Sequence, residues 1–197
     1  MITAGITGGI ASGKSVVCEV FKLLGVPVYN ADTAAKVLAN TDREIKNDLI
    51  KLFGDDIYEG NNLNRKKLSE IIFNNKTALE NTNKIIHPRV INDFLRWAEE
   101  HKDHKYILME AAILYESGTY KMLNKVITVT APKQLRISRA LSRENFTKQI
   151  IENIQKNQIL DEEKVKRSHY VILNDNKTLI LPQILRIHQQ LLNINRA

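Results

Sequence analysis

Short apolar runs alternate with longer amphipathic stretches along most of the chain. Residues 2–7 are an apolar run that ends in a glycine-rich turn, and residues 15–24 repeat apolar positions at helical spacing until Gly25 stops the pattern. Residues 26–29 predict a second strand. Three later buried strands are predicted at 106–109, 126–129 and 170–173, the last followed by a C-terminal helix. Strands that alternate with helices predict an α/β fold with a parallel sheet and right-handed crossovers.

The middle of the chain, up to about residue 105, is mainly helical in pattern. Helices are predicted over 34–38, 43–53, 65–73, 76–86 and 88–101. Proline disfavours helical geometry at the residue before it, so His87, which precedes Pro88, is expected at a junction between two helices. A further helical stretch is predicted between residues 132 and 167.

Composition and charge narrow the class of protein. The net charge of the 197 residues is +7, and residues 132–167 carry nine Lys/Arg against five Asp/Glu, whereas residues 33–104 carry twelve of each sign. A basic helical stretch late in the chain predicts an anionic partner and an element that covers phosphates. The single cysteine, Cys18, cannot form an internal disulfide and is expected to pack a helix on the sheet.

The sequence also bears on membranes and compartment. No stretch approaches the roughly 18 uninterrupted apolar residues of a membrane span, and residues 1–20 lack the pattern of a signal peptide. We therefore expect a cytoplasmic protein with no membrane partner. Nothing in the sequence indicates an oligomeric state.

The glycine-rich turn fits the phosphate-binding P-loop pattern, with four residues between Gly8 and the Gly13-Lys14-Ser15 triplet. At this spacing successive backbone amides can surround phosphate oxygens while the following helix directs its positive end at the same charge. Lys14 would reach the β- and γ-phosphates and Ser15 would bind Mg²⁺. The residues expected to bind ATP in this loop are Gly9, Ile10, Ala11, Ser12, Gly13, Lys14, Ser15 and Val16. The alternative is a strand-to-helix turn with a chance Lys-Ser.

A P-loop is shared by GTPases, motor ATPases and kinases. The chain has no Asn-Lys-x-Asp guanine motif and no Asp-x-x-Gly switch, and it is short for a motor core. A small-molecule kinase needs a phosphate loop, an acceptor site, a base and a basic lid, and the chain offers candidates for each. Two alternatives remain at this point: a nucleoside or nucleotide monophosphate kinase, and a nucleic-acid-binding protein regulated by nucleotide. The aromatic content of 6% disfavours nucleic acid as a partner.

Several motifs in order carry a family resemblance. They are GITGGIASGKS, the NAD that follows the second predicted strand, LNRKKLSEIIF, IIHPRV, LYESG, QLRISRALSREN and HYVILND. With these motifs the whole chain resembles the dephospho-coenzyme A kinase family of P-loop kinases. The resemblance implies ATP-dependent phosphorylation of the ribose 3′-hydroxyl of dephospho-CoA, the last step of CoA synthesis, by a phosphotransferase with an alcohol acceptor. It also implies a core of residues 1–32, 105–135 and 168–197, an inserted helical acceptor subdomain at 33–104 and a helical lid at 136–167.

The chain departs from the family pattern at four places. Asn30 stands where the family has the first Asp of an Asp-Ala-Asp, and Glu110 stands where it has an Asp. The usual Pro-Leu-Leu is Ala112-Ile113-Leu114, and a lid arginine is replaced by Ile154, with Lys156 as a candidate substitute for the lost charge.

Asp32 is the candidate general base. A carboxylate at the carboxyl edge of a parallel sheet faces the ligand crevice, where it can accept a proton from a hydroxyl. An Asp that caps a helix starting near Thr33 explains the residue equally well from position alone. The family resemblance implies the catalytic role.

Glu110 ends a predicted strand, where it could hold Mg²⁺ or orient the acceptor; a surface carboxylate at a strand end is the alternative. The resemblance places His87, Arg65 and Arg89 in the acceptor-binding region, where they would supply positive charge or donors to the acceptor's phosphates. A structural histidine and a solvated basic helix face are the alternatives.

The lid segment carries Arg136, Arg139 and Arg143 at helical spacing, which predicts that all three lie on one side of a helix. Like charges so placed repel unless an anion joins them, so the triphosphate is the expected partner, with Arg139 or Arg143 in a catalytic role. A solvated basic face paired with Glu144 is the alternative. Asn174 follows the last predicted strand, where it would either meet the adenine base or form a turn with Asp175.

Overall fold

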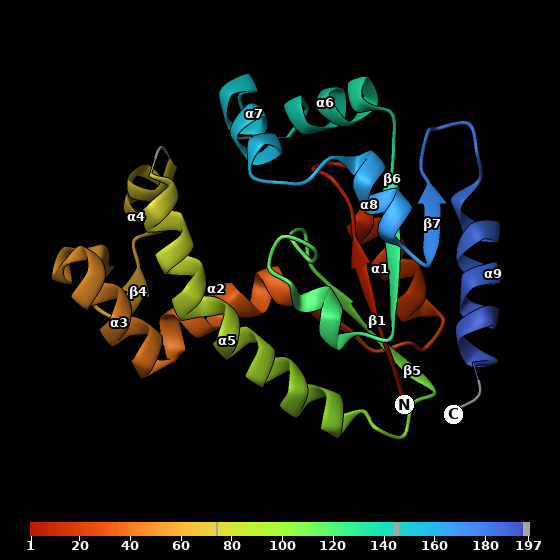
Figure 1. The fold of residues 1–197 in the computed structure, drawn as a ribbon, viewed down its shortest axis with the longest axis horizontal. Helices are drawn as coiled ribbons and strands as arrows, with labels where there is room; N and C mark the ends of the chain where they lie inside the picture. The colour runs from red at the N-terminus through yellow and green to blue at the C-terminus, as the bar shows by residue number, and fades with distance from the viewer. Residues whose placement is uncertain (74, 144–145, 195–197) are drawn as a thin grey trace. The chain divides into compact units, whose positions relative to one another are not determined.

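Two compact units make up the chain. The computed structural model describes residues 1–73, 75–143 and 146–194 (Figure 1). Residues 1–30 and 98–197 form the first unit, and Ala31–Trp97 form the second.

A five-stranded parallel sheet is the centre of the first unit (Figure 1). Its strands are β1 Ile2–Thr7, β2 Val28–Asn30, β5 Tyr106–Glu110, β6 Lys125–Thr130 and β7 Tyr170–Leu173. They lie in the order β2-β5-β1-β6-β7, and every neighbouring pair is parallel. The predicted parallel α/β fold is therefore confirmed. The chain leaves β1 toward β2 on one side and later returns to β6 on the other, so the carboxyl end of β1 is the switch point where open α/β sheets bind ligands.

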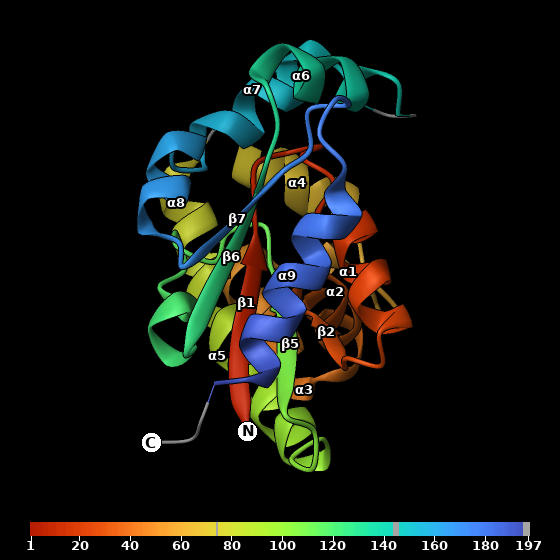
Figure 2. The same cartoon turned by 90° about the vertical axis from the view of Figure 1, so that its right-hand side faces the viewer.

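Helices cover both faces of this sheet. Figure 2 shows α1 Lys14–Leu23 and α9 Ile180–Leu192 on one face, with α8 Asp161–Arg167 on the other side of β6. The core beneath α1 and α9 is formed by buried side chains such as Val17, Phe21 and Ile184. Cys18 belongs to the same cluster and is 1% exposed, which confirms the expected buried thiol. The predicted basic helical stretch consists of α6 Lys133–Leu141, α7 Lys148–Lys156 and α8. A short 3-10 helix, η2 Thr119–Met122, precedes β6.

Helix α8 presents Asp161 and Lys164 to the protein interior, and their spacing of three residues places them on one face. Lys164 is fully buried, and its Nζ donates to Glu116 Oε1 at 2.9 Å and to the Ala112 carbonyl at 3.1 Å. Arg167, three residues further along, is exposed, and its guanidinium lies 4.6 Å from the Tyr115 ring centroid. A helix whose sequence is almost entirely charged can pack on the sheet because its inward charges are paired.

The second unit has its own small core. It contains α2 Ala31–Thr41, α3 Arg43–Phe53, the turn η1 Asp55–Ile57, the hairpin of β3 Tyr58–Glu59 and β4 Asn62–Leu63, α4 Arg65–Phe73 and most of α5 Lys76–Glu100. Ile45, Leu49 and Ile57 are fully buried at its centre. Asp42 caps α3 because its side chain accepts from the amides of Glu44 and Ile45. No described helix is both long enough and apolar enough to cross a lipid bilayer.

Helix α5 corrects the expected helix junction at His87. The structure has one helix of 25 residues with Pro88 inside it, where two shorter helices were expected. An interior proline removes one backbone hydrogen bond and costs about 3 kcal/mol. Ile85, Ile86 and Val90 bury apolar surface on both sides of the proline, and this burial offsets the local cost.

Lys164 provides a test of the inward-facing charges. Lys164→Met leaves the Glu116 carboxylate without its buried cation, and we expect a loss of about 3–5 kcal/mol in the free energy of unfolding. The matched control is Lys166→Met on the same helix, whose side chain is 71% exposed and pairs with Glu163 at the surface. Urea unfolding followed by circular dichroism measures both; equal midpoints for the two variants would contradict this account.

Candidate active site

The turn between β1 and α1 has the backbone geometry of a phosphate-binding loop. Gly13 has φ +99°, Ala11 has φ +56°, and the Ser12 amide donates to the Gly9 carbonyl at 3.2 Å. Helix α1 then starts at Lys14 with no acidic residue in its first turn. The positive end of its dipole is therefore available to an anion.

Neighbouring groups press on this loop so closely that side chains are excluded. A Cβ built at Gly8 would lie less than 3.0 Å from the Val129 carbonyl oxygen, and one at Gly13 would lie equally close to Asn174 Nδ2. Real Cβ atoms do not approach that near. The loop is thus rich in glycine because its neighbours leave no room for a Cβ atom, and also because of its backbone conformation.

The side chains of the Lys-Ser pair lie near the carboxyl ends of β1 and β5. Lys14 Nζ donates to the Gly8 carbonyl at 3.2 Å, so the side chain folds back over the loop. Ser15 Oγ donates to Glu110 Oε1 at 3.1 Å. Glu110 is 6% exposed, which excludes the alternative of a surface carboxylate.

Two of the departures from the family pattern contact each other. Asn30 and Glu110 are register partners on β2 and β5, and Asn30 Nδ2 donates to Glu110 Oε2 at 2.7 Å. A carboxylate at residue 30 would set a second negative charge against this buried carboxylate, whereas the amide donates to it. Asn30 and Ser15 thus engage both oxygens of Glu110.

Cys18 lies one turn of α1 beyond Ser15. Burial raises the pKa of its thiol well above the usual value, and the charge of Glu110 raises it further. The thiol stays protonated at neutral pH, so it is a packing group and not a nucleophile.

The lid arginines are not arranged as the sequence predicts. Arg136 and Arg139 lie on α6, but α6 ends at Leu141, so Arg143 lies beyond the helix and is exposed. Arg136 is buried and pairs with Asp161 (Nη2 to Oδ2, 3.2 Å). The prediction of three arginines on one helical face is therefore wrong, because helix α6 is too short and its first arginine turns inward to a carboxylate. Glu144, the alternative partner, is outside the described residues.

Arg139 and Asn174 lie together against the end of the loop. Arg139 Nη2 donates to the Asn174 carbonyl at 3.2 Å and to Asn174 Oδ1 at 3.3 Å, while Asn174 Nδ2 donates to the Ser12 carbonyl at 2.9 Å. The amide of Asn174 is thus committed to the P-loop. Its neighbour Asp175 forms the turn, since its carboxylate accepts from two following amides, which lower its pKa.

Two buried donors beside the loop have no hydrogen-bond partner among the described residues: Ser12 Oγ and Arg139 Nη1. Buried polar groups are normally paired, so an unpaired donor at such a loop fits a ligand acceptor. Both atoms therefore fit a phosphorylated ligand that the P-loop would hold.

Apolar side chains connect the loop to the lid helices. Ile10 and Ala11 are buried in a cluster with Ala140 and Ile151, and Ile154 packs against it. Ile154 replaces the family's lid arginine, and here it adds apolar surface to the cluster. Val16 is 55% exposed on α1, while Lys156, the candidate substitute for the lost arginine, is exposed at the end of α7.

The remaining candidate residues belong to the second unit. Asp32 is exposed in the first turn of α2, which starts at Ala31. Arg65 Nη2 donates to the Lys36 carbonyl at 3.1 Å, and Arg89 pairs with Glu44. Burial lowers the pKa of His87, which favours the neutral imidazole near pH 7, so of the two expected contributions, charge or a donor, it offers the hydrogen-bond donor.

Two buried charged residues of α8 were not predicted from the sequence. Asp161 and Lys164 are buried on α8, yet their segment DEEKVKR has the composition of a solvated helix. Their spacing of three residues places both on one face, but only knowledge of the partners on other elements shows that this face is buried.

Comparison with known proteins identifies the family. A sequence profile described as dephospho-CoA kinase matches residues 2–179. A dephospho-CoA kinase of Bacteroides fragilis is 41% identical over 187 residues, covering 94% of this chain and 91% of the relative. Among solved structures, a dephospho-CoA kinase from Campylobacter jejuni superposes with a TM-score of 0.69 at 27% identity and covers 95% of this chain and 96% of its own. A protein from Thermus thermophilus gives a TM-score of 0.81 at 27% identity, with coverage of 97% and 96%.

The close packing at Gly8 can be tested with two glycine variants. Gly8→Ala forces a methyl group onto the Val129 carbonyl, and we expect the affinity for Mg·ATP to fall at least about tenfold. The control is Gly25→Ala at the other end of α1, where φ is also positive (+79°) but nothing lies within 4 Å of the new methyl group. Isothermal titration calorimetry measures both affinities. Equal binding by Gly8→Ala and the control would show that the loop tolerates a side chain.

Proposed function

Because the chain belongs to the dephospho-CoA kinase family, we propose a residue-level account of how it carries out that family's reaction. The protein is a kinase that uses ATP and acts at the final step of CoA biosynthesis. The family fixes the reaction, and the roles of individual side chains are inferred from their contacts. Dephospho-CoA and ATP are the two substrates.

The contact of Ser15 with Glu110 carries the proposal. A hydroxyl and a buried carboxylate, 3.1 Å apart beside the P-loop, are oxygen ligands of the kind that Mg²⁺ accepts. The described residues contain no group of three His, Cys, Asp or Glu side chains suited to a metal. The pair of Ser15 and Glu110 nevertheless fits Mg²⁺, because this ion commonly binds through one or two protein oxygens together with substrate phosphates and water. Mg²⁺, when bound, neutralises charge on the β- and γ-phosphates.

The phosphate-binding groups surround the same point. The amides of residues 9–15 and the positive end of α1 would hold the β- and γ-phosphates, with Lys14 turning from the Gly8 carbonyl to reach them. Arg139 Nη1 and Ser12 Oγ, the buried donors without partners, would donate to phosphate oxygens. Val16 and Asn174 would lie at the edge of the nucleotide site, and the exposed Arg143 would approach the transferred group when the lid segment 136–167 covers ATP.

Asp32 is the proposed general base. It follows Asn30 by two residues, and a trans peptide holds consecutive Cα atoms about 3.8 Å apart, so its Cα stays within about 8 Å of that of Asn30. Asn30 in turn donates to Glu110. This short separation along the chain supports Asp32 as the base.

The reaction needs one proton transfer and one displacement. Asp32 accepts the proton of the ribose 3′-hydroxyl while that oxygen bonds to the γ-phosphorus; the bond from the γ-phosphorus to the β,γ-bridging oxygen breaks, and ADP leaves. Lys14 and Arg139 stabilise the charge on the transferred group. The protein contributes mainly position and electrostatics.

Acceptor recognition is assigned to residues 33–104, alongside a core of 1–32, 105–135 and 168–197. Arg65 and Arg89 would bind phosphates of dephospho-CoA, and the neutral His87 would donate a hydrogen bond. Arg89 would exchange Glu44 for the anionic acceptor. Both partners of this ion pair are at least one third exposed, so the exchange costs little.

An acceptor panel tests the function directly. With Mg·ATP, the purified protein is expected to add one phosphoryl group to dephospho-CoA at the 3′ position, identified by mass and by phosphorus NMR. Nucleosides and nucleoside monophosphates are expected to give no product. Turnover of a nucleotide in place of dephospho-CoA would overturn the assignment.

Replacement of Asp32 tests the proposed base. Asp32→Asn keeps the shape of the side chain but cannot accept the proton, so we expect kcat to fall about 10²- to 10⁴-fold with little change in the KM for ATP. Asp48→Asn, an exposed carboxylate on α3, is the control and should behave as wild type. An unimpaired kcat in Asp32→Asn assigns the proton transfer elsewhere.

A further inference from the structure

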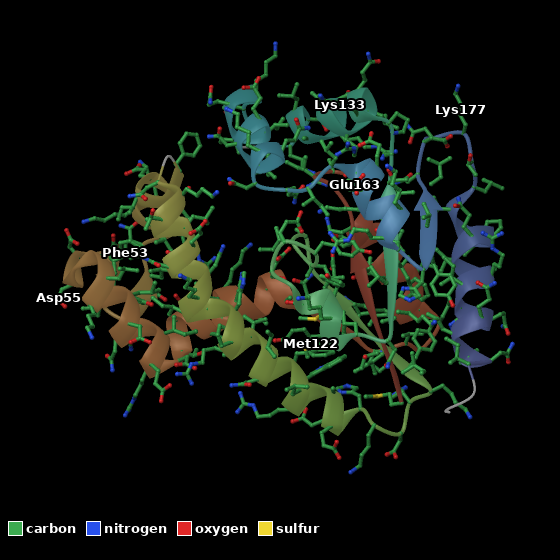
Figure 3. The ribbon with its side chains drawn as sticks, viewed as in Figure 1. Phe53, Asp55, Met122, Lys133, Glu163 and Lys177 are labelled. Carbon is green, nitrogen blue, oxygen red and sulfur yellow. The ribbon has the colours of Figure 1, made fainter. Side chains whose placement is uncertain are left out.

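A buried ion pair lies behind the P-loop and joins two lid helices. Arg136 comes from α6 and Asp161 from the first residue of α8, with side chains 10% and 9% exposed and 3.2 Å between Nη2 and Oδ2. Figure 3 labels Lys133 at the start of α6 and Glu163 on α8, which mark the two helices. Arg136 Nε also donates to the Ala131 carbonyl at 3.0 Å, and the Thr130 hydroxyl donates to Asp161 Oδ2 at 3.4 Å.

The pair packs directly on Gly9. A Cβ built at Gly9 would lie less than 3.0 Å from both Arg136 Nη1 and Asp161 Oδ1. Gly9 is not among the glycines with positive φ, so its backbone conformation does not demand glycine. The position needs glycine because the ion pair occupies the space where a side chain would lie. The pair therefore supports the second residue of the P-loop from behind.

A pocket of about 670 Å³ is bordered by Arg136 and Asp161, and Gly9 is not part of its wall. The pair therefore lies between Gly9 and an open space. The charge of Asp161 and the Ala131 carbonyl hold the guanidinium against Gly9.

We propose that Arg136 and Asp161 are positioning residues for ATP: they hold the P-loop in the shape that binds phosphates, and neither contacts the nucleotide. When the charge of Asp161 is removed, Arg136 turns toward the pocket and the backbone at Gly9 loses its support. The amides near Gly9 are then no longer preorganised for phosphate oxygens. The inference rests on the proposed function only in that ATP binds at the P-loop.

Asp161→Asn is the first test, because it removes the charge at constant shape. We expect the KM for ATP and the ATP dissociation constant to rise about five- to tenfold, with the KM for dephospho-CoA unchanged. The control is Glu163→Gln on the same helix, an isosteric loss of an exposed carboxylate that pairs with Lys166. It should leave both ATP constants unchanged.

A second variant separates positioning from stability. Replacement of a buried ion pair by apolar residues often restores stability, so Arg136→Met/Asp161→Leu should keep a thermal midpoint near that of wild type. We expect the double variant still to bind ATP about five- to tenfold more weakly. If Asp161→Asn fails to fold, the ATP affinity of the double variant tests the proposal in its place.

The outcomes are distinct. A double variant with wild-type midpoint and wild-type ATP affinity would show that the pair is structural only, and the proposal would fail. A lower kcat with unchanged KM for ATP in Asp161→Asn, the result of a smaller folded fraction, would also overturn it. Calorimetric ATP binding needs no acceptor, so an error in the assigned acceptor reaction would appear in the acceptor panel and not here.

Discussion

The turn from β1 into α1 is the constraint on which the rest of the first unit depends. It must stay narrow enough to present amides to phosphate, and distinct parts of the chain press on it: the Val129 carbonyl of β6 at Gly8, the Arg136–Asp161 pair at Gly9 and the Asn174 amide at Gly13. Each contact requires glycine on the loop side. Glycine is therefore needed in this loop for two reasons: neighbouring strands and helices leave no space for a side chain, and some positions have a backbone conformation that favours glycine.

The sheet and most of the helices follow from the sequence because their signals are local. The apolar run at residues 2–7 and the one at 170–173 form strands with those bounds, and residues 43–53 and 65–73 form helices as predicted. The junction expected at Pro88 was wrong because tertiary packing of Ile86 and Val90 overrides a local preference. Local sequence patterns thus predict where strands and helices lie, but they do not show whether two adjacent helical segments form one continuous helix.

The candidate site was predictable where a motif dictates chemistry, as at Lys14 and Ser15. Other contacts depend on partners distant in sequence. Glu110 was expected to bind metal or acceptor, but its burial and its bond to Asn30 required the register of β2 against β5. Arg136 was expected to meet the triphosphate or solvent, yet it pairs with Asp161 inside the protein. Lys164, which counts toward the basic stretch at 132–167, likewise pairs with Glu116. Charge counted along the lid sequence therefore overstates the positive charge that remains for a ligand.

The buried thiol of Cys18 has a consequence for how the enzyme responds to its surroundings. Oxidants and alkylating agents react with the thiolate, and a thiol that is 1% exposed and remains protonated offers almost none. Cys18 is also the one sulfhydryl of the chain. Oxidation of a cysteine is therefore not expected to switch this enzyme on or off.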